Sequence, residues 1–119
     1  MVVFKECVTR EFAAFATNAK RPVSDFLRAL ARDLNASTPG RGVGVIGQCW
    51  SGGFALAAAV DDAVLAPVLS QPSLPLPLTA ARRRDPGVSE DELKVVQRRA
   101  AEEGLCALGL RFSEDRMSP

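Results

Sequence analysis

The chain has 119 residues, of which 47% are hydrophobic and 24% charged, and this composition is typical of one globular domain. Its formal net charge of +1 at pH 7 gives no electrostatic reason to expect binding to nucleic acid or to an anionic membrane surface. No apolar run approaches the ~20 residues of a membrane span, and residues 1–10 lack the pattern of a secretory signal.

Cysteine and histidine usage limits the possible chemistry. Cys7, Cys49 and Cys106 are odd in number and widely spaced, which indicates neither a disulfide framework nor a metal site. The sequence therefore predicts a cytoplasmic protein that holds no metal ion and no organic cofactor. It contains no histidine, which is the usual general base for a serine or cysteine nucleophile.

The first clear element in chain order is a helix over residues 21–36, after an ambiguous segment over residues 1–19. Pro22 suits the first turn of a helix, and residues 35–40 end it with turn formers. Apolar residues recur at three- and four-residue steps, which predicts one apolar face. That face comprises Val23, Phe26, Leu27, Leu30, Ala31 and Leu34, and the polar face comprises Asp25, Arg28, Arg32 and Asp33.

Two strands and a second helix are expected next. Residues 43–47 form a continuous apolar run, as in a strand that is buried on both faces. Residues 52–60 are rich in Ala, Leu and Phe and are predicted to form a buried helix. Residues 63–69 have the pattern of another strand, in which Pro67 marks an end or an irregularity.

The last third of the chain is predicted to hold a loop, a helix and a strand. Residues 70–80 interleave prolines with leucines, which indicates a stiff apolar loop that either walls a substrate pocket or packs as an ordinary loop. The arginines at 82–84 fit a solvated loop better than a phosphate site. Residues 89–92 have capping-box spacing and begin a helix that runs to about Glu103. An apolar strand follows over residues 105–112.

This alternation of helices and strands predicts an α/β fold with a three-layer α/β/α arrangement around a parallel sheet. Three strands are few for such a sheet, and at least one apolar edge strand is expected to remain unpaired. We therefore interpret residues 1–119 as a single partial domain, the central part of a larger fold.

Residues 42–59 carry the pattern of a nucleophile elbow, in which a strand, an abrupt turn and a helix follow one another. Gly47 allows the strand and the helix to approach closely, and the small residues 51–53 suit the far side of the turn. Cys49 then occupies the strained position beside the N-terminus of the helix, where a thiolate and an oxyanion are both favoured. The alternative is a cysteine that serves as a small core residue.

With residues 47–55, the strand over residues 64–69 and a late strand leading to Asp115, the chain resembles the dienelactone hydrolase family. The resemblance extends from about Cys7 to Pro119. Members of that family are α/β-hydrolases that carry a cysteine at the elbow and open ester or lactone bonds with a Cys-His-Asp triad. The resemblance implies a partial α/β-hydrolase fold and a small-molecule ester or lactone substrate.

The resemblance also implies roles for individual residues. Cys49 matches the nucleophile, and the backbone N–H of Trp50 matches one donor of the oxyanion hole. Asp115 matches the acid that orients the histidine. Arg10 and Glu11 lie where a substrate-binding or thiol-contacting group is expected. For Arg10, Glu11 and Asp115 the alternative is an ordinary surface charge.

The chain departs from the family pattern in three ways. Ser51 stands where the family has a glycine, the early strands with the second oxyanion donor are missing, and so is the histidine that follows the acid. The sequence therefore predicts that this chain by itself has little or no turnover.

Two other interpretations remain open at this point. In the first, the chain is a non-catalytic remnant or pseudoenzyme that forms a homo-oligomer, or binds another chain, through its open sheet edge. In the second, Cys49 has a thiol redox or thioester-forming role, although the sequence has no Cys-x-x-Cys motif.

Overall fold

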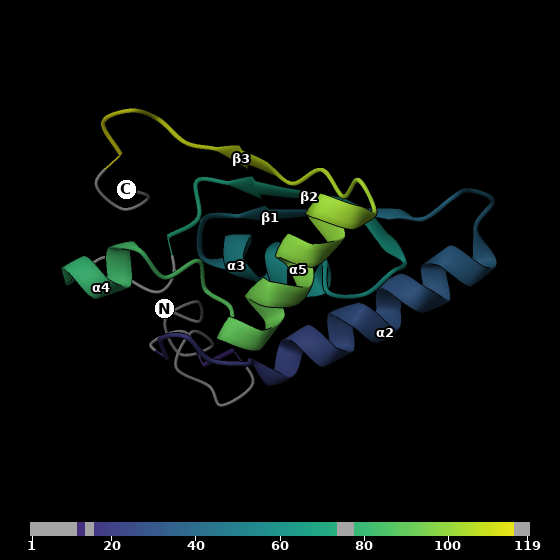
Figure 1. The fold of residues 1–119 in the computed structure, drawn as a ribbon, viewed down its shortest axis with the longest axis horizontal. Helices are drawn as coiled ribbons and strands as arrows, with labels where there is room; N and C mark the ends of the chain where they lie inside the picture. The colour runs from purple at the N-terminus through teal and green to yellow at the C-terminus, as the bar shows by residue number, and fades with distance from the viewer. Residues whose placement is uncertain (1–11, 14–15, 74–77, 116–119) are drawn as a thin grey trace, which may run out of the picture.

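The computed structural model describes residues 12–13, 16–73 and 78–115, and its elements follow the predicted order except for two short helices that were not predicted (Figure 1). One of them, over Ala80–Arg83, includes Arg82 and Arg83, which were predicted to lie in a loop. The predicted segment over residues 1–19 therefore lies mostly outside the described residues. The helices are α2 (Pro22–Ser37), the 3-10 helix η1 (Cys49–Ser51), α3 (Gly52–Ala58), α4 (Ala80–Arg83) and α5 (Glu90–Glu102), and the strands are β1 (Val43–Gln48), β2 (Val64–Ser70) and β3 (Leu108–Leu110).

The three strands form a parallel sheet in the order β1-β2-β3, which confirms the predicted mixed α/β class. Pairing of β2 with β3 begins at Val68 and Leu108, one residue beyond Pro67. The missing N–H of Pro67 therefore does not interrupt that ladder. Within the described part of the chain, the outer edge of β1 and the outer edge of β3 have no strand beside them.

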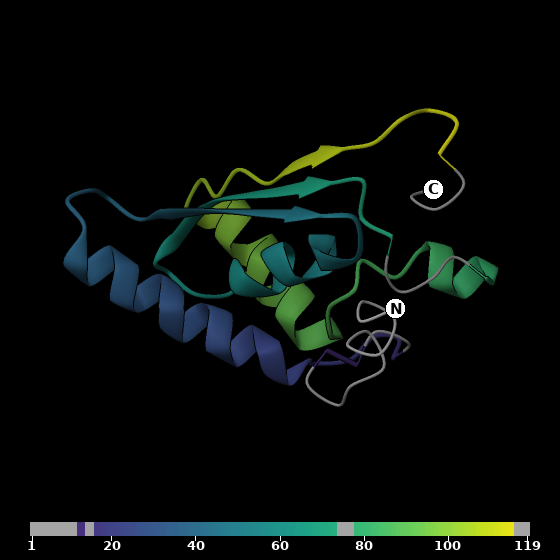
Figure 2. The same cartoon turned by 180° about the vertical axis from the view of Figure 1, so that it is seen from behind.

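The described helices α2, α3 and α5 lie on one face of the sheet, as both views of the fold show (Figures 1 and 2). Helix α3 packs directly against the sheet and is buried at every position, as its Ala-rich sequence predicts. On the other face Ile46 is 69% exposed, and Leu108 and Leu110 are each 48% exposed. The residues described here thus form two layers, and they do not include the second helical layer of the predicted three-layer arrangement.

Helix α2 (Pro22–Ser37) confirms the predicted span to within one residue, but much of its predicted apolar face is exposed. Phe26 is 65% exposed, and Leu30 and Leu34 on the same apolar stripe are also exposed. Part of this stripe forms a groove of about 240 Å³ with β1, at the β1 edge of the sheet. The groove is lined by Leu27, Leu30, Ala31, Leu34, Val43, Gly44, Val45 and Ile46.

The prediction that Arg28 lies on the polar face of α2 is wrong, because its side chain is buried. Its Nε and Nη2 donate to the carbonyl of Ala57 in α3 at 2.9 and 2.7 Å, and Nη2 also contacts Glu92 of α5 at 2.5 Å. A buried guanidinium is tolerated when its donors are satisfied in this way. Arg28 therefore joins three helices instead of facing solvent.

Helix α5 begins with the predicted capping box. The hydroxyl of Ser89 accepts from the N–H of Glu92 at 3.3 Å, and the Glu92 carboxylate accepts from the N–H of Ser89 at 2.9 Å. The helix stops before Gly104, whose φ of +73° favours glycine. Strand β3 is shorter than the predicted span of residues 105–112, since only Leu108–Leu110 pair with β2, opposite Val68–Ser70.

Candidate active site

Cys49 is the first residue of η1, at the abrupt turn that follows directly on β1, as the elbow pattern predicts. Its φ is +52°, in the left-handed region that residues other than glycine rarely adopt. Such strain is concentrated at functional sites, where the surrounding structure maintains it. The thiol is exposed, so the alternative prediction of a buried core cysteine is wrong.

Two glycines allow the close packing that forms the elbow. A Cβ at Gly47 would lie 2.9 Å from the Cα of Gly52 and closer still to the carbonyl oxygen of Ser51. A Cβ at Gly52 would lie 2.5 Å from Cβ of Pro72. These positions require glycine because backbone atoms or a rigid proline ring occupy the space of a side chain.

Ser51, which stands where the dienelactone hydrolase pattern has a glycine, closes the turn around Cys49. Its hydroxyl accepts from the backbone N–H of Gln48 at 2.9 Å and donates to the carbonyl of Gln48 at 2.8 Å. The side chain thus holds the last residue of β1 against the start of the helix. The expectation that a small residue preserves the turn is confirmed.

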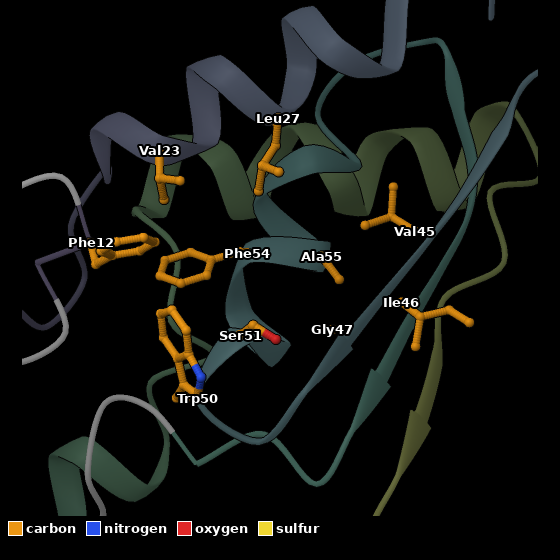
Figure 3. Close-up of a pocket in the computed structure, with 10 residues that line it drawn as sticks. All are labelled: Phe12, Val23, Leu27, Val45, Ile46, Gly47, Trp50, Ser51, Phe54 and Ala55. Atoms are coloured by element: carbon orange, nitrogen blue, oxygen red, sulfur yellow. The ribbon is translucent and has the colours of Figure 1, made fainter. Parts of the chain in front are cut away.

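Trp50 belongs to an aromatic cluster behind the elbow. Its ring packs edge-on against Phe12 and Phe54, with centroids 5.1 and 5.8 Å apart. The cluster forms one end of an apolar pocket of about 210 Å³ that extends toward β1 (Figure 3). The pocket is lined by Phe12, Val23, Leu27, Val45, Ile46, Gly47, Trp50, Ser51, Phe54 and Ala55, and therefore not by Cys49 itself.

A buried arginine supports this cluster, and sequence reasoning did not identify it. The guanidinium of Arg21 lies 5.8 Å from the ring centroid of Phe54 and donates to the carbonyls of Gly87 and, at 2.9 Å, Ala16. Burial lowers the pKa of Arg21 from its ordinary value, while the nearby carboxylate of Asp85 opposes that shift. Its contacts to backbone carbonyls indicate a structural role.

Ser73 contacts Cys49 directly. Its Oγ lies 3.2 Å from Sγ of Cys49, and its backbone N–H donates to the carbonyl of Cys49 at 3.0 Å. The sequence predicts that segment 70–80 walls a pocket or packs as a loop, and its pattern does not single out Ser73. The position of Ser73 three residues after β2 is the one sequence feature that places it near Cys49. Parallel strands bring the residues that follow them to the same edge of the sheet.

The other predicted site residues have different outcomes. Asp115 follows the carboxyl end of β3, as Cys49 follows β1 and Ser73 follows β2. The carboxyl ends of these parallel strands lie at one edge of the sheet. Its backbone N–H donates to the carbonyl of Phe112 at 3.2 Å. Arg10 and Glu11 lie outside the described residues. The orientation role of Asp115 and the roles of those two residues stay predictions.

Over residues 12–13, 16–73 and 78–115, no group of three or more His, Cys, Asp or Glu side chains is placed so that it could hold a metal ion. None of the helices in these ranges has the length and apolar character needed to cross a membrane. Comparison with protein-family models, with curated proteins and with solved structures finds no match.

Proposed function

We propose that Cys49 is the nucleophile of an ester or lactone hydrolase of the dienelactone hydrolase type. The observation that carries this proposal is the exposed thiol on a residue with a φ of +52°, in the turn between β1 and the helix behind it. A non-glycine residue held in this conformation at a strand-to-helix turn is the geometry of a nucleophile elbow. The substrate class is a small-molecule ester or lactone.

The proposed reaction has two steps. The thiolate of Cys49 attacks the acyl carbon, the carbonyl π electrons move to oxygen, and the backbone N–H of Trp50 donates to that oxyanion. Collapse expels the alkoxide, which takes up a proton, and leaves a thioester on Sγ. Water then attacks the thioester and releases the acid and the thiol. Asp115 would orient a histidine base, and the chain has none; we therefore expect acylation without appreciable turnover.

The proposal includes a larger sheet within a three-layer α/β/α hydrolase fold. Two apolar surfaces support this part: the groove between α2 and the outer edge of β1, and the uncovered sheet face that carries Ile46 and Leu108. Apolar surfaces of this kind are costly to leave in water. A further strand beside β1 would fill the groove, and a second helical layer would cover the face.

An activated ester such as p-nitrophenyl acetate tests the first step. We expect one equivalent of p-nitrophenol to be released quickly, with an acetyl group found on Cys49 by peptide mass spectrometry, and little release afterwards. Cys49→Ala should abolish the burst. Cys106→Ala is the matched control, because Cys106 is also an exposed cysteine but lies away from the elbow, and it should leave the burst unchanged.

Two results would contradict the proposal. A burst of equal size in Cys49→Ala would show that another group is acylated. Sustained release dependent on Cys49 would contradict the expectation of little turnover, and would mean that the chain deacylates without histidine.

A second candidate function is a non-catalytic module that forms a homo-oligomer through the β1 edge. It is favoured by the six-residue strand Val43–Gln48, which has neither charged residues nor proline to prevent edge-to-edge pairing. Light scattering coupled to size exclusion should then report a dimer. Ile46→Lys, which adds a charge at a side chain that is already exposed, should return it to a monomer. A monomeric unmodified chain would overturn this alternative.

A further inference from the structure

We propose that Ser73 is a positioning residue for Cys49, whose hydroxyl orients the thiol for attack. This inference rests on the proposed function, in which Cys49 is the nucleophile. Ser73 Oγ lies 3.2 Å from Sγ, and the Ser73 N–H donates to the Cys49 carbonyl at 3.0 Å. The same residue therefore holds both the backbone and the side chain of Cys49.

The thiol needs such a partner because Cys49 is exposed. An exposed side chain has few packing contacts to select one χ1 rotamer, and free rotation lowers the fraction of time in which sulfur faces an incoming carbonyl. A hydrogen bond at 3.2 Å selects the rotamer in which Sγ lies against Ser73. The remaining sulfur lone pairs are then available to a substrate on the solvent side.

Ser73 can orient the thiol because its own position is fixed from two sides. The N–H of Gln71 donates to the carbonyl of Leu110 in β3 at 2.7 Å, which ties the segment to the sheet. Pro72 restricts the backbone and packs against Gly52 at the start of α3. Ser73 itself is only 8% exposed. The hydroxyl of Ser73 is therefore held in place and can orient the Cys49 thiol.

The chemistry of the hydroxyl limits what Ser73 can do. A serine hydroxyl can donate to the sulfur or accept from the S–H, but it is not a base at neutral pH and cannot replace a histidine. Ser73 should therefore affect the step in which sulfur attacks. It should not accelerate the attack of water on a thioester.

Alkylation by iodoacetamide, followed residue by residue with peptide mass spectrometry, tests this role. We expect Ser73→Ala to slow alkylation of Cys49 roughly five- to tenfold, the size expected for one lost hydrogen bond. Ser73→Thr keeps the hydroxyl and should restore the rate to within about twofold of the unmodified chain. Cys106 in the same chain is the internal reference and should react at an unchanged rate. Ser70→Ala, the same change at the end of β2, is the matched control and should leave Cys49 unaffected.

The outcomes separate this inference from the proposed function. An unchanged alkylation rate of Cys49 in Ser73→Ala would overturn the positioning role of Ser73. Equal slowing in Ser73→Ala and Ser73→Thr would overturn it too, because it would mean that packing and not the hydroxyl affects the thiol. If Ser73→Ala slows alkylation but the chain gives no burst with p-nitrophenyl acetate, only the proposed hydrolase function fails. If the burst is present and Ser73→Ala alkylates normally, only this inference fails.

Discussion

Gly47→Ala should destabilise the protein by about 3 kcal/mol or more, at or above the upper end of the usual cost of overpacking. The added methyl would lie 2.9 Å from the Cα of Gly52, and it would also approach the carbonyl of Ser51. Both neighbours are backbone atoms, so no side-chain rotation can relieve the contact. Relief requires helix α3 to move away from β1, and α3 is buried along its whole length.

The measurement is urea unfolding followed by the fluorescence of Trp50, the only tryptophan, which lies in the elbow itself. Gly44→Ala is the control on the same strand, because its methyl would lie 3.6 Å from the carbonyl of Ala66, an ordinary contact. Alanine loses less backbone entropy than glycine, so Gly44→Ala should be neutral or stabilising by up to about 1 kcal/mol. Equal unfolding midpoints for the two variants would contradict the proposed geometry of the elbow.

Gly47→Ala should also change the reactivity of Cys49, since the same displacement alters the turn. We expect the alkylation rate of Cys49 to move toward that of the exposed reference Cys106. This second measurement ties the stability effect to the elbow rather than to the sheet in general.

The elbow could be predicted because local sequence determines it. Glycines at positions where two backbones meet, a small residue after the turn and an apolar strand before it are all readable within one short segment. The helix boundaries were predictable for the same reason, since Pro22 and the Ser89–Glu92 capping box act within one turn of the chain.

The contacts between distant segments could not be read in this way. Periodicity assigned Arg28 to the polar face of its helix, but it cannot show that a carbonyl of α3 and a carboxylate of α5 lie opposite that face. Ser73 is 24 residues from Cys49 along the chain, and only the pairing of β1 with β2 brings the two together. Only three residues of β3 pair with β2, and this register is again a property of the assembled sheet.

Arg99→Met should cost about 2–6 kcal/mol, because it leaves two buried carbonyls without their donor at about 1–3 kcal/mol each. Nη1 of Arg99 donates to three carbonyls at the end of α3 and the start of β2, those of Ala59 and Asp61 at 2.7 Å and of Val64 at 3.2 Å. Ala59 and Val64 are fully buried, so water cannot replace the lost donor there. Methionine keeps an apolar stem of similar length, so the loss of stability reflects the lost hydrogen bonds more than a loss of side-chain volume.

The neighbouring Arg98 provides the control, because it is exposed on the same helix, and Arg98→Met should change stability by less than about 0.5 kcal/mol. High salt should weaken the effect of Arg99 only slightly, since it screens the ion pairs with the more exposed Glu103 and Asp62 but hardly the hydrogen bonds to the buried carbonyls. Because the three carbonyls anchor the far end of the helix that begins at the elbow, Arg99→Met should also bring the unfolding monitored by Trp50 to a lower urea concentration. Similar midpoints for Arg98→Met and Arg99→Met would mean that the Arg99 contacts add nothing to the stability of α3.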